Sequence, residues 1–255
     1  MRITDFEFES FEAQIPRGVA NSDHGEVVFY VPSRPAAVRF ETLFSKEPET
    51  IAWIADFETG GIFVDVGANV GMYTIWAAKH RNMRVHAFEP EAQNFATLNQ
   101  NIRLNNLGQQ VIAYGAAISD EAKFSVLNLG DLRIGGAFNS FDEPVGHDLK
   151  PREPLFRQGA ISTTLDGLVS DGTLPLPNHI KIDVDGFEHK VVQGARQTLS
   201  APEVKSVMIE LNPELEIHMD LVTVFRDLGF EEPPQFAERF EARGGGNCLF
   251  RRSGS

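Results

Sequence analysis

Short apolar runs alternate with amphipathic stretches along most of the chain, beginning near residue 62. Ile62 to Val66 is nearly all apolar, and Met72 to Lys79 follows with helical spacing. Arg84 to Phe88 and Gln93 to Asn105 repeat the same order of strand and helix. Strands that take turns with crossover helices pair in parallel, so the pattern predicts an α/β fold built on a parallel sheet.

The alternation continues toward the C-terminal end with one long interruption. We expect further strands at 110–118, 124–129, 179–184, 206–211 and 246–251, and helices at 188–199 and 213–228. Between 130 and 154 the chain is rich in Gly, Pro, Asp and Asn, which predicts a long loop. Such a loop is either a lid over a binding site or a surface insertion.

We expect the first 46 residues to form an N-terminal extension, a strand or cap segment, ahead of a main domain at 47–255. Glu26 to Val31 is strand-like, and prolines follow it. Residues 47–58 then have helical spacing and end at the glycine pair Gly60 and Gly61.

Composition narrows the classes of partner. Hydrophobic residues make up 42% of the 255 residues, enough for a sizeable core, and the net charge is −13. A field of that sign repels nucleic acid and anionic membranes, so neither is expected as a partner. No apolar run approaches the roughly 18 residues of a membrane span, and no signal peptide is evident. With one cysteine, Cys248, there is no internal disulfide, and we expect a cytoplasmic protein.

The first chemical motif runs from Asp65 to Gly71, where a strand, a glycine turn and a helix meet. Glycine lets the backbone approach a ligand, and a helix start offers N–H groups to an anion. The spacing of Gly67 and Gly71 matches neither the dinucleotide fingerprint nor the P-loop. Asp65 suits a ligand that carries an ammonium and a sulfonium group; a tight packing turn without a ligand is the alternative.

The second motif is Glu89, which ends the next strand 22 positions after Gly67. An acid near this spacing accepts hydrogen bonds from ribose hydroxyls, and a carboxylate has two oxygens for them. The alternative is an acid at a helix N-terminus, ahead of Pro90.

The third motif, from Lys181 to His189, gathers acids and a histidine at another strand end. Asp183 and Asp185 share one side of an extended chain. Close carboxylates raise one another's pKa or hold a cation such as Mg²⁺, but the spacing matches no established ligand set, so no metal is expected. The alternative is a helix cap, with Asp185 as N-cap and Glu188 as its partner.

Taken in order, these pieces resemble the FkbM family of S-adenosylmethionine (SAM) dependent methyltransferases. The matching pieces are Glu47–Thr50, Phe63–Thr74, Ala87–Pro90, Asn101, Ala116–Asp120, Thr164–Asp166, Lys181–Glu188, Gly194–Ala195 and Ile209–Glu210. They span about 47–212. The family usually has Glu where Asp185 stands.

The resemblance implies a class I methyltransferase fold, with a mostly parallel seven-stranded sheet, a last antiparallel strand and helices on both faces. It implies SAM as cofactor, with the methionine part beside Asp65 to Gly71, the ribose on Glu89 and the adenine beside Ala117 to Ser119. The full set of implied cofactor residues is Asp65, Gly67, Ala68, Asn69, Gly71, Tyr73, Thr74, Glu89, Pro90, Ala117, Ile118, Ser119 and Asp183.

Family members are commonly O-methyltransferases of sugars and other natural products, which implies a small-molecule acceptor here. A hydroxyl acceptor needs a base, and we expect Asp183 in that role, with Asp185, Glu188 or His189 nearby. Glu210 and Asn212 are expected beside the acceptor, although Asn212 is equally an N-cap ahead of Pro213. A nicotinamide-dependent oxidoreductase and a non-catalytic binding module are the rival interpretations, and the oligomeric state, including a homodimer, stays open.

Overall fold

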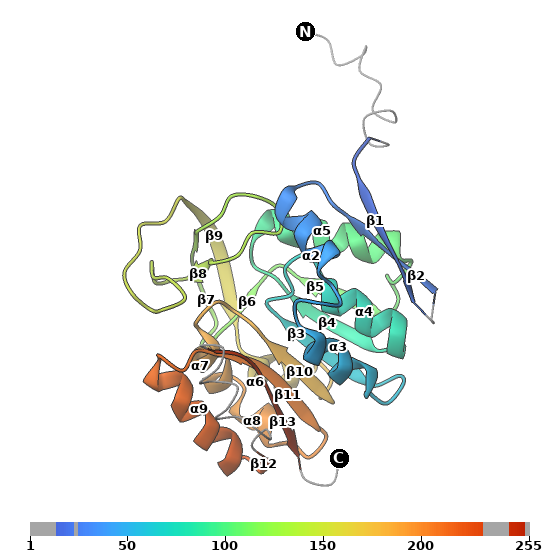
Figure 1. Ribbon diagram of the computed structural model, residues 1–255. Helices are drawn as coiled ribbons and strands as arrows, with labels where there is room; N and C mark the ends of the chain where they lie inside the picture. Colours follow the sequence, from blue (N-terminus) through green and yellow to red (C-terminus); the bar gives the residue numbers. More distant parts are fainter. Residues whose placement is uncertain (1–13, 23–24, 232–244, 253–255) are drawn as a thin grey trace.

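A seven-stranded sheet forms the centre of the computed structural model, which describes residues 14–22, 25–231 and 245–252. Over these residues the strand order is β12-β13-β11-β10-β3-β4-β5 (Figure 1). The strands are β3 (Ile62–Val66), β4 (Arg84–Phe88), β5 (Val111–Tyr114), β10 (His179–Ile182), β11 (Ser206–Leu211), β12 (Phe230–Glu231) and β13 (Gly246–Arg252). The five from β5 to β11 are parallel, and β13 runs antiparallel to β11. The expected fold class is confirmed.

Helices cover both faces of this sheet. The helices are α3 (Pro48–Ala55), α4 (Met72–Arg81) and α5 (Ala92–Leu104) on one face, and α6 (Leu165–Ser170), α7 (Glu188–Gln193), α8 (Arg196–Ser200) and α9 (Glu216–Asp227) on the other. Strand β3 serves both: Phe63 packs in one core cluster, and Val64 and Val66 pack in the other. Successive strand residues point to opposite faces, which is why apolar residues occupy both sides of this strand, with Asp65 as its one polar residue.

A second, four-stranded sheet was not expected. Its order is β6-β9-β7-β8, formed by β6 (Ala117–Ile118), β7 (Lys123–Leu129), β8 (Ser140–Phe141) and β9 (Phe156–Thr163). The predicted strand at 110–118 is therefore wrong as one element. The chain bends at Gly115, so that β5 stays in the main sheet while β6 pairs with β9. The strand predicted at 124–129 is confirmed as β7.

Two predicted helices differ from the structure. The helix at 188–199 breaks at Gly194, where a Cβ would lie 2.1 Å from the carbonyl oxygen of Ser119, so two short helices replace it. The helix at 213–228 begins only at Glu216. Asn212 is not its N-cap, because its side-chain oxygen accepts the amide of Glu214 in a turn, and Leu215 holds the cap position.

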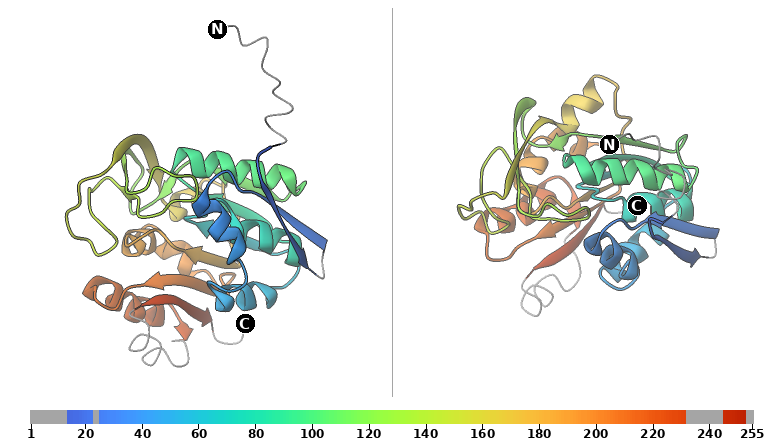
Figure 2. Two further views of the ribbon diagram at one scale, coloured as in Figure 1. Left: turned by 45° about the horizontal axis from the view of Figure 1, so that its top comes forward. Right: turned by 90° about the horizontal axis from the view of Figure 1, so that it is seen from above.

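The N-terminal segment packs into the domain that it precedes. It forms a hairpin of β1 (Arg17–Ser22) and β2 (Gly25–Tyr30), followed by α2 (Arg34–Glu41), and the hairpin lies along α5 (Figure 2). Asn101 of α5 and Asn105 at its C-cap accept the amides of Tyr30 and Val28 at 2.7 and 2.9 Å. Val27 and Phe29 join the same core as α4. In the described part of the chain, no helix is long and apolar enough to cross a bilayer.

Candidate active site

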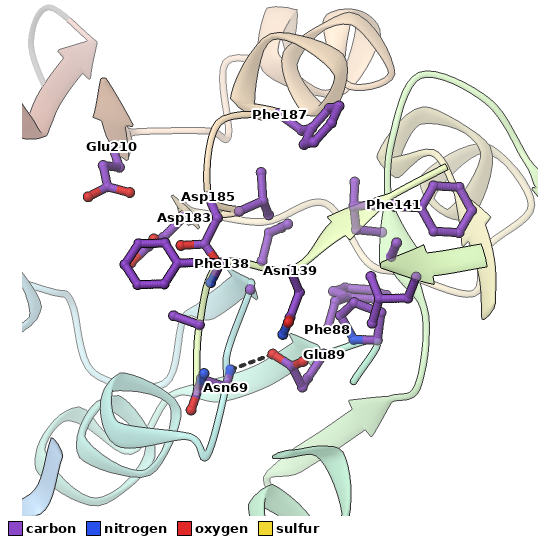
Figure 3. Close-up of a pocket in the computed structure, with 18 of the residues that line it drawn as sticks. Asn69, Phe88, Glu89, Phe138, Asn139, Phe141, Asp183, Asp185, Phe187 and Glu210 are labelled. Atoms are coloured by element: carbon purple, nitrogen blue, oxygen red, sulfur yellow. Dashed lines mark hydrogen bonds between the residues drawn. The ribbon is translucent and has the colours of Figure 1, made fainter. Parts of the chain in front are cut away.

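The carboxyl ends of the parallel strands border a cavity of about 250 Å³ (Figure 3). Strand-end residues from all three motifs line it: Gly67, Asn69, Glu89, Pro90, Asp183 and Asp185, together with Ala117, Ile118, Ser119 and Glu210. In an open α/β sheet this edge is where ligands bind. The structure therefore brings most of the expected cofactor residues into one place.

The glycine turn after β3 is tightly packed. Gly67 has φ +81°, and a Cβ there would lie 1.8 Å from the carbonyl oxygen of Asp183, so only glycine fits. The turn amides are all used within the chain: Gly67 and Ala68 donate to the Phe88 carbonyl, Asn69 to Glu89, Val70 to the Asn69 side chain and Gly71 to the Ala68 carbonyl. The expectation that this turn holds an anion with its amides is wrong for these five.

The Glu89 side chain is held in the cavity by two backbone hydrogen bonds. Its side chain is only 5% exposed, and its two oxygens accept the amides of Asn69 and Glu91, each at 2.8 Å. Burial raises the pKa of Glu89 to about 7 in spite of these two bonds. The helix-cap alternative is wrong, because Glu91 caps α5 by accepting the amides of Gln93 and Asn94. Each Glu89 oxygen keeps a lone pair for a ligand hydroxyl.

Asp65 lies beneath the turn rather than in the large cavity. It is 2% exposed, accepts the hydroxyl of Thr74 at 2.5 Å, and pairs in register with Lys181 of β10. It borders a smaller cavity of about 30 Å³, together with Ala68 and Tyr73. Of the implied cofactor residues, Gly71 and Thr74 border neither cavity; Gly71 has φ +87° at the start of α4.

Lys181 was not predicted as a site residue, yet it lies among the acids Glu47, Asp65 and Asp183. Its side chain is 2% exposed, and its Nζ donates to Asp183 at 2.6 Å and lies 3.9 Å from Glu47. Burial works against the charge of Asp183, but the Lys181 ammonium prevails and lowers the pKa of Asp183 to about 2. At neutral pH Asp183 is thus a firmly ionised partner of Lys181 and a weak proton acceptor.

Asp185 borders the same cavity, but its backbone conformation differs from the expected one. Its φ of +57° is left-handed rather than extended, and its Oδ2 accepts the amide of Phe138 at 2.7 Å. Burial and the neighbouring charge of Asp183 raise the pKa of Asp185 to about 6. The alternative that Asp185 caps α7 is wrong, because the cap position belongs to Phe187.

Glu188 and His189 border neither cavity. Glu188 is fully buried, where its Oε1 accepts the amides of Val184 and Gly186 and its Oε2 lies 3.3 Å from Nε2 of His218. Burial raises the pKa of Glu188 to about 8 and lowers the pKa of His189. Glu188 is thus bonded within the chain, and the described residues contain no group of three or more His, Cys, Asp or Glu side chains arranged to hold a metal.

The long loop covers the cavity. Asn69 donates to the carbonyl of Gly136 at 2.7 Å, Asn94 accepts the amide of Gly135 at 2.7 Å, and Arg39 donates to the carbonyl of Gly135 at 2.7 Å. Phe138, Asn139 and Phe141 then line the cavity (Figure 3). This favours the lid over the surface insertion; the sequence signal for the loop was the abundance of Gly, Pro, Asp and Asn between 130 and 154. Asn212, expected beside the acceptor, does not border the cavity.

Comparisons with known proteins point to one family of methyltransferases. A family model described as Methyltransferase FkbM domain matches residues 65–232. The hexuronic acid methyltransferase AglP of Haloferax volcanii is 28% identical over 165 residues, which cover 62% of this chain and 59% of AglP. The 31-O-demethyl-FK506 methyltransferase FkbM of Streptomyces tacrolimicus is 24% identical over 208 residues, 71% of this chain and 78% of that protein.

The fold also has a solved counterpart. The crystal structure of a methyltransferase FkbM from Methylobacillus flagellatus superimposes with a TM-score of 0.50 at 14% identity, covering 96% of this chain and 57% of that one. At that identity the likeness concerns the fold alone. The chain spans less than two thirds of AglP and of this solved structure.

Proposed function

This chain belongs to the FkbM family of methyltransferases, and on that premise we propose that it transfers a methyl group from SAM to a hydroxyl oxygen of a small-molecule acceptor, such as a sugar or another natural product. Two relatives are named for a hexuronic acid and for a demethylated FK506 as substrates, both small oxygen-rich molecules. The acidic net charge and the covered cavity support a small acceptor over a nucleic acid.

The observation that carries the proposal is the geometry of Glu89. A buried carboxylate with both oxygens fixed by backbone amides is preorganised to accept two neighbouring ribose hydroxyls. Ala117, Ile118 and Ser119 line the same cavity, where the family resemblance expects the adenine. The position of Glu89 beside these residues supports an adenosyl ligand with its ribose on Glu89.

SAM, when bound, supplies a methyl group that is already activated, so the chain has to align the acceptor, exclude water and take a proton. We assign the proton to Asp185 rather than to Asp183. Both border the cavity, but Lys181 holds Asp183 ionised, whereas the pKa of Asp185 near 6 makes it ready to accept a proton at neutral pH. The lid residues Phe138 and Phe141 keep water away from that step.

The test is a comparison of SAM, S-adenosylhomocysteine and NAD by calorimetry on the wild-type chain and on Glu89→Gln. We expect Glu89→Gln to weaken the binding of SAM and of S-adenosylhomocysteine at least about tenfold. A hydrogen bond to a charged group contributes about 1.5–3 kcal/mol, and tenfold in affinity is about 1.4 kcal/mol. Glu203→Gln, an exposed acid outside both cavities, is the matched control. Tight binding of NAD without binding of SAM would favour the oxidoreductase and overturn the proposal.

A screen of hydroxylated acceptors with SAM then tests the reaction. The expected product is a methyl ether that resists alkali, detected by mass spectrometry. An alkali-labile product would instead identify a methyl ester and a carboxylate acceptor.

A further inference from the structure

Two cationic side chains stand where the large and small cavities meet. Arg39 of α2 and Lys46, in the turn before α3, are the cations that border both. Both belong to the N-terminal segment, outside the region that the family model matches. Their charges act on the acids of the site, because each helps to lower the pKa of Asp183.

The small cavity has the charges of an amino-acid binding site. Glu47, Asp65 and Asp183 border it as acceptors for an ammonium group, and Arg39 and Lys46 face it as donors. Lys181 also borders it but is committed to Asp183 and Glu47. A volume of about 30 Å³ holds about two water-sized groups, which suits a charged head group and excludes a ring.

A carboxylate in this place needs side-chain donors. The five amides of the turn from Gly67 to Gly71 are bonded within the chain, so that turn has none to offer. Lys46 is 57% exposed and pairs with Glu47 at 3.1 Å, which leaves two of its three protons for another acceptor. Arg39 uses its Nε on the Gly135 carbonyl, and the described part of the chain offers its terminal nitrogens no partner.

We propose that Arg39 and Lys46 bind the carboxylate at the amino-acid end of SAM, while Glu47 and Asp65 face its ammonium group. The guanidinium fork matches a carboxylate, and the same side chain holds the lid at Gly135. One residue of the N-terminal segment thus joins cofactor binding to lid placement. This inference rests on the proposed function.

The experiment compares two ligands that differ in the amino-acid end. S-adenosylhomocysteine carries it, and 5′-methylthioadenosine lacks it. Calorimetry measures both on the wild type, on Arg39→Met and Lys46→Met, and on Arg34→Met, which removes a cation of α2 that is 72% exposed and outside both cavities. Binding of 5′-methylthioadenosine also reports that each variant is folded.

We expect Arg39→Met and Lys46→Met each to weaken S-adenosylhomocysteine about tenfold or more, and to change 5′-methylthioadenosine less than about twofold. Arg34→Met should change neither. Equal losses of affinity for both ligands would overturn the assignment. They would mean that the two cations support the lid or the fold instead of binding the carboxylate. Unchanged affinity for S-adenosylhomocysteine would overturn it too. A wild-type chain that binds neither ligand would overturn the proposed function itself, which distinguishes the two failures.

Discussion

Replacing Lys181 by Met removes a buried ammonium that stands among Glu47, Asp65 and Asp183. Lys181 is 2% exposed, and its Nζ lies 2.6 Å from Asp183 and 3.9 Å from Glu47. Methionine keeps the unbranched shape, so the loss is mainly electrostatic. Breaking a buried ion pair by removing one partner costs about 3–5 kcal/mol, because the remaining charges stay buried. That is a large part of the roughly 5–15 kcal/mol that holds a domain folded.

The pH dependence of this loss follows from the pKa values. In the wild type the pKa of Asp183 is lowered to about 2 from 3.8, so the stability it contributes is present above the unfolded value and is lost as pH falls through about 2. Without Lys181, burial and mutual repulsion raise the folded pKa values of Asp183 and Asp65. A raised pKa makes the folded state less stable as pH rises through it. The penalty is therefore largest at neutral pH and shrinks toward about pH 4.

Urea unfolding followed by the fluorescence of the buried Trp53 and Trp76 measures the effect. We expect a loss of about 3–5 kcal/mol near pH 7 and a clearly smaller loss near pH 4.5. Adding Asp183→Asn to Lys181→Met should restore part of the stability, because one buried charge disappears. A loss below about 1 kcal/mol, or one that is the same at both pH values, would refute the reasoning.

Two further predictions concern the reaction and the turn. Asp185→Asn should lower kcat about 10²–10⁴-fold with SAM affinity nearly unchanged, as expected for a lost base; in the wild type kcat/KM should rise with pH through about 6, where Asp185 loses its proton. A flat pH profile would remove Asp185 from the role. Gly67→Ala should destabilise the fold by about 2–5 kcal/mol in thermal or urea unfolding, from a left-handed backbone and a Cβ 1.8 Å from the Asp183 oxygen. Gly108→Ala, where a Cβ meets open space, is its control and should shift stability by less than about 0.5 kcal/mol.

Local pattern predicted the elements that carry the site. The strands at 62–66, 84–88 and 206–211 match the structure residue for residue, because strands buried on both faces are mostly apolar and stand out as short apolar runs. Since the carboxyl ends of parallel strands share one edge, the chain pattern also placed Glu89 and Asp183 together. The antiparallel last strand, β13, came from the family resemblance.

Other parts of the site depend on contacts between distant segments, which a local pattern does not contain. Gly194, where the predicted helix breaks, packs against the carbonyl oxygen of Ser119, and β6, after the bend at Gly115, pairs with β9 instead of the main sheet. Asp185 enters the cavity through a left-handed backbone rather than through strand alternation. Arg39 borders the cavity because α2 packs against the lid at Gly135, far away in the sequence.

The sequence by itself determined most strands and helices of the main sheet, the acids at the strand ends and the glycine turn. Each of these follows from spacing along the chain, and spacing is local. Only the tertiary structure decided the state of those acids. Asp183 and Asp185 stand two positions apart with similar side chains, yet Lys181 lowers the pKa of one to about 2 while burial raises the pKa of the other to about 6. A pKa depends on burial and on the charges of neighbours in space, and those are set only when the chain is folded.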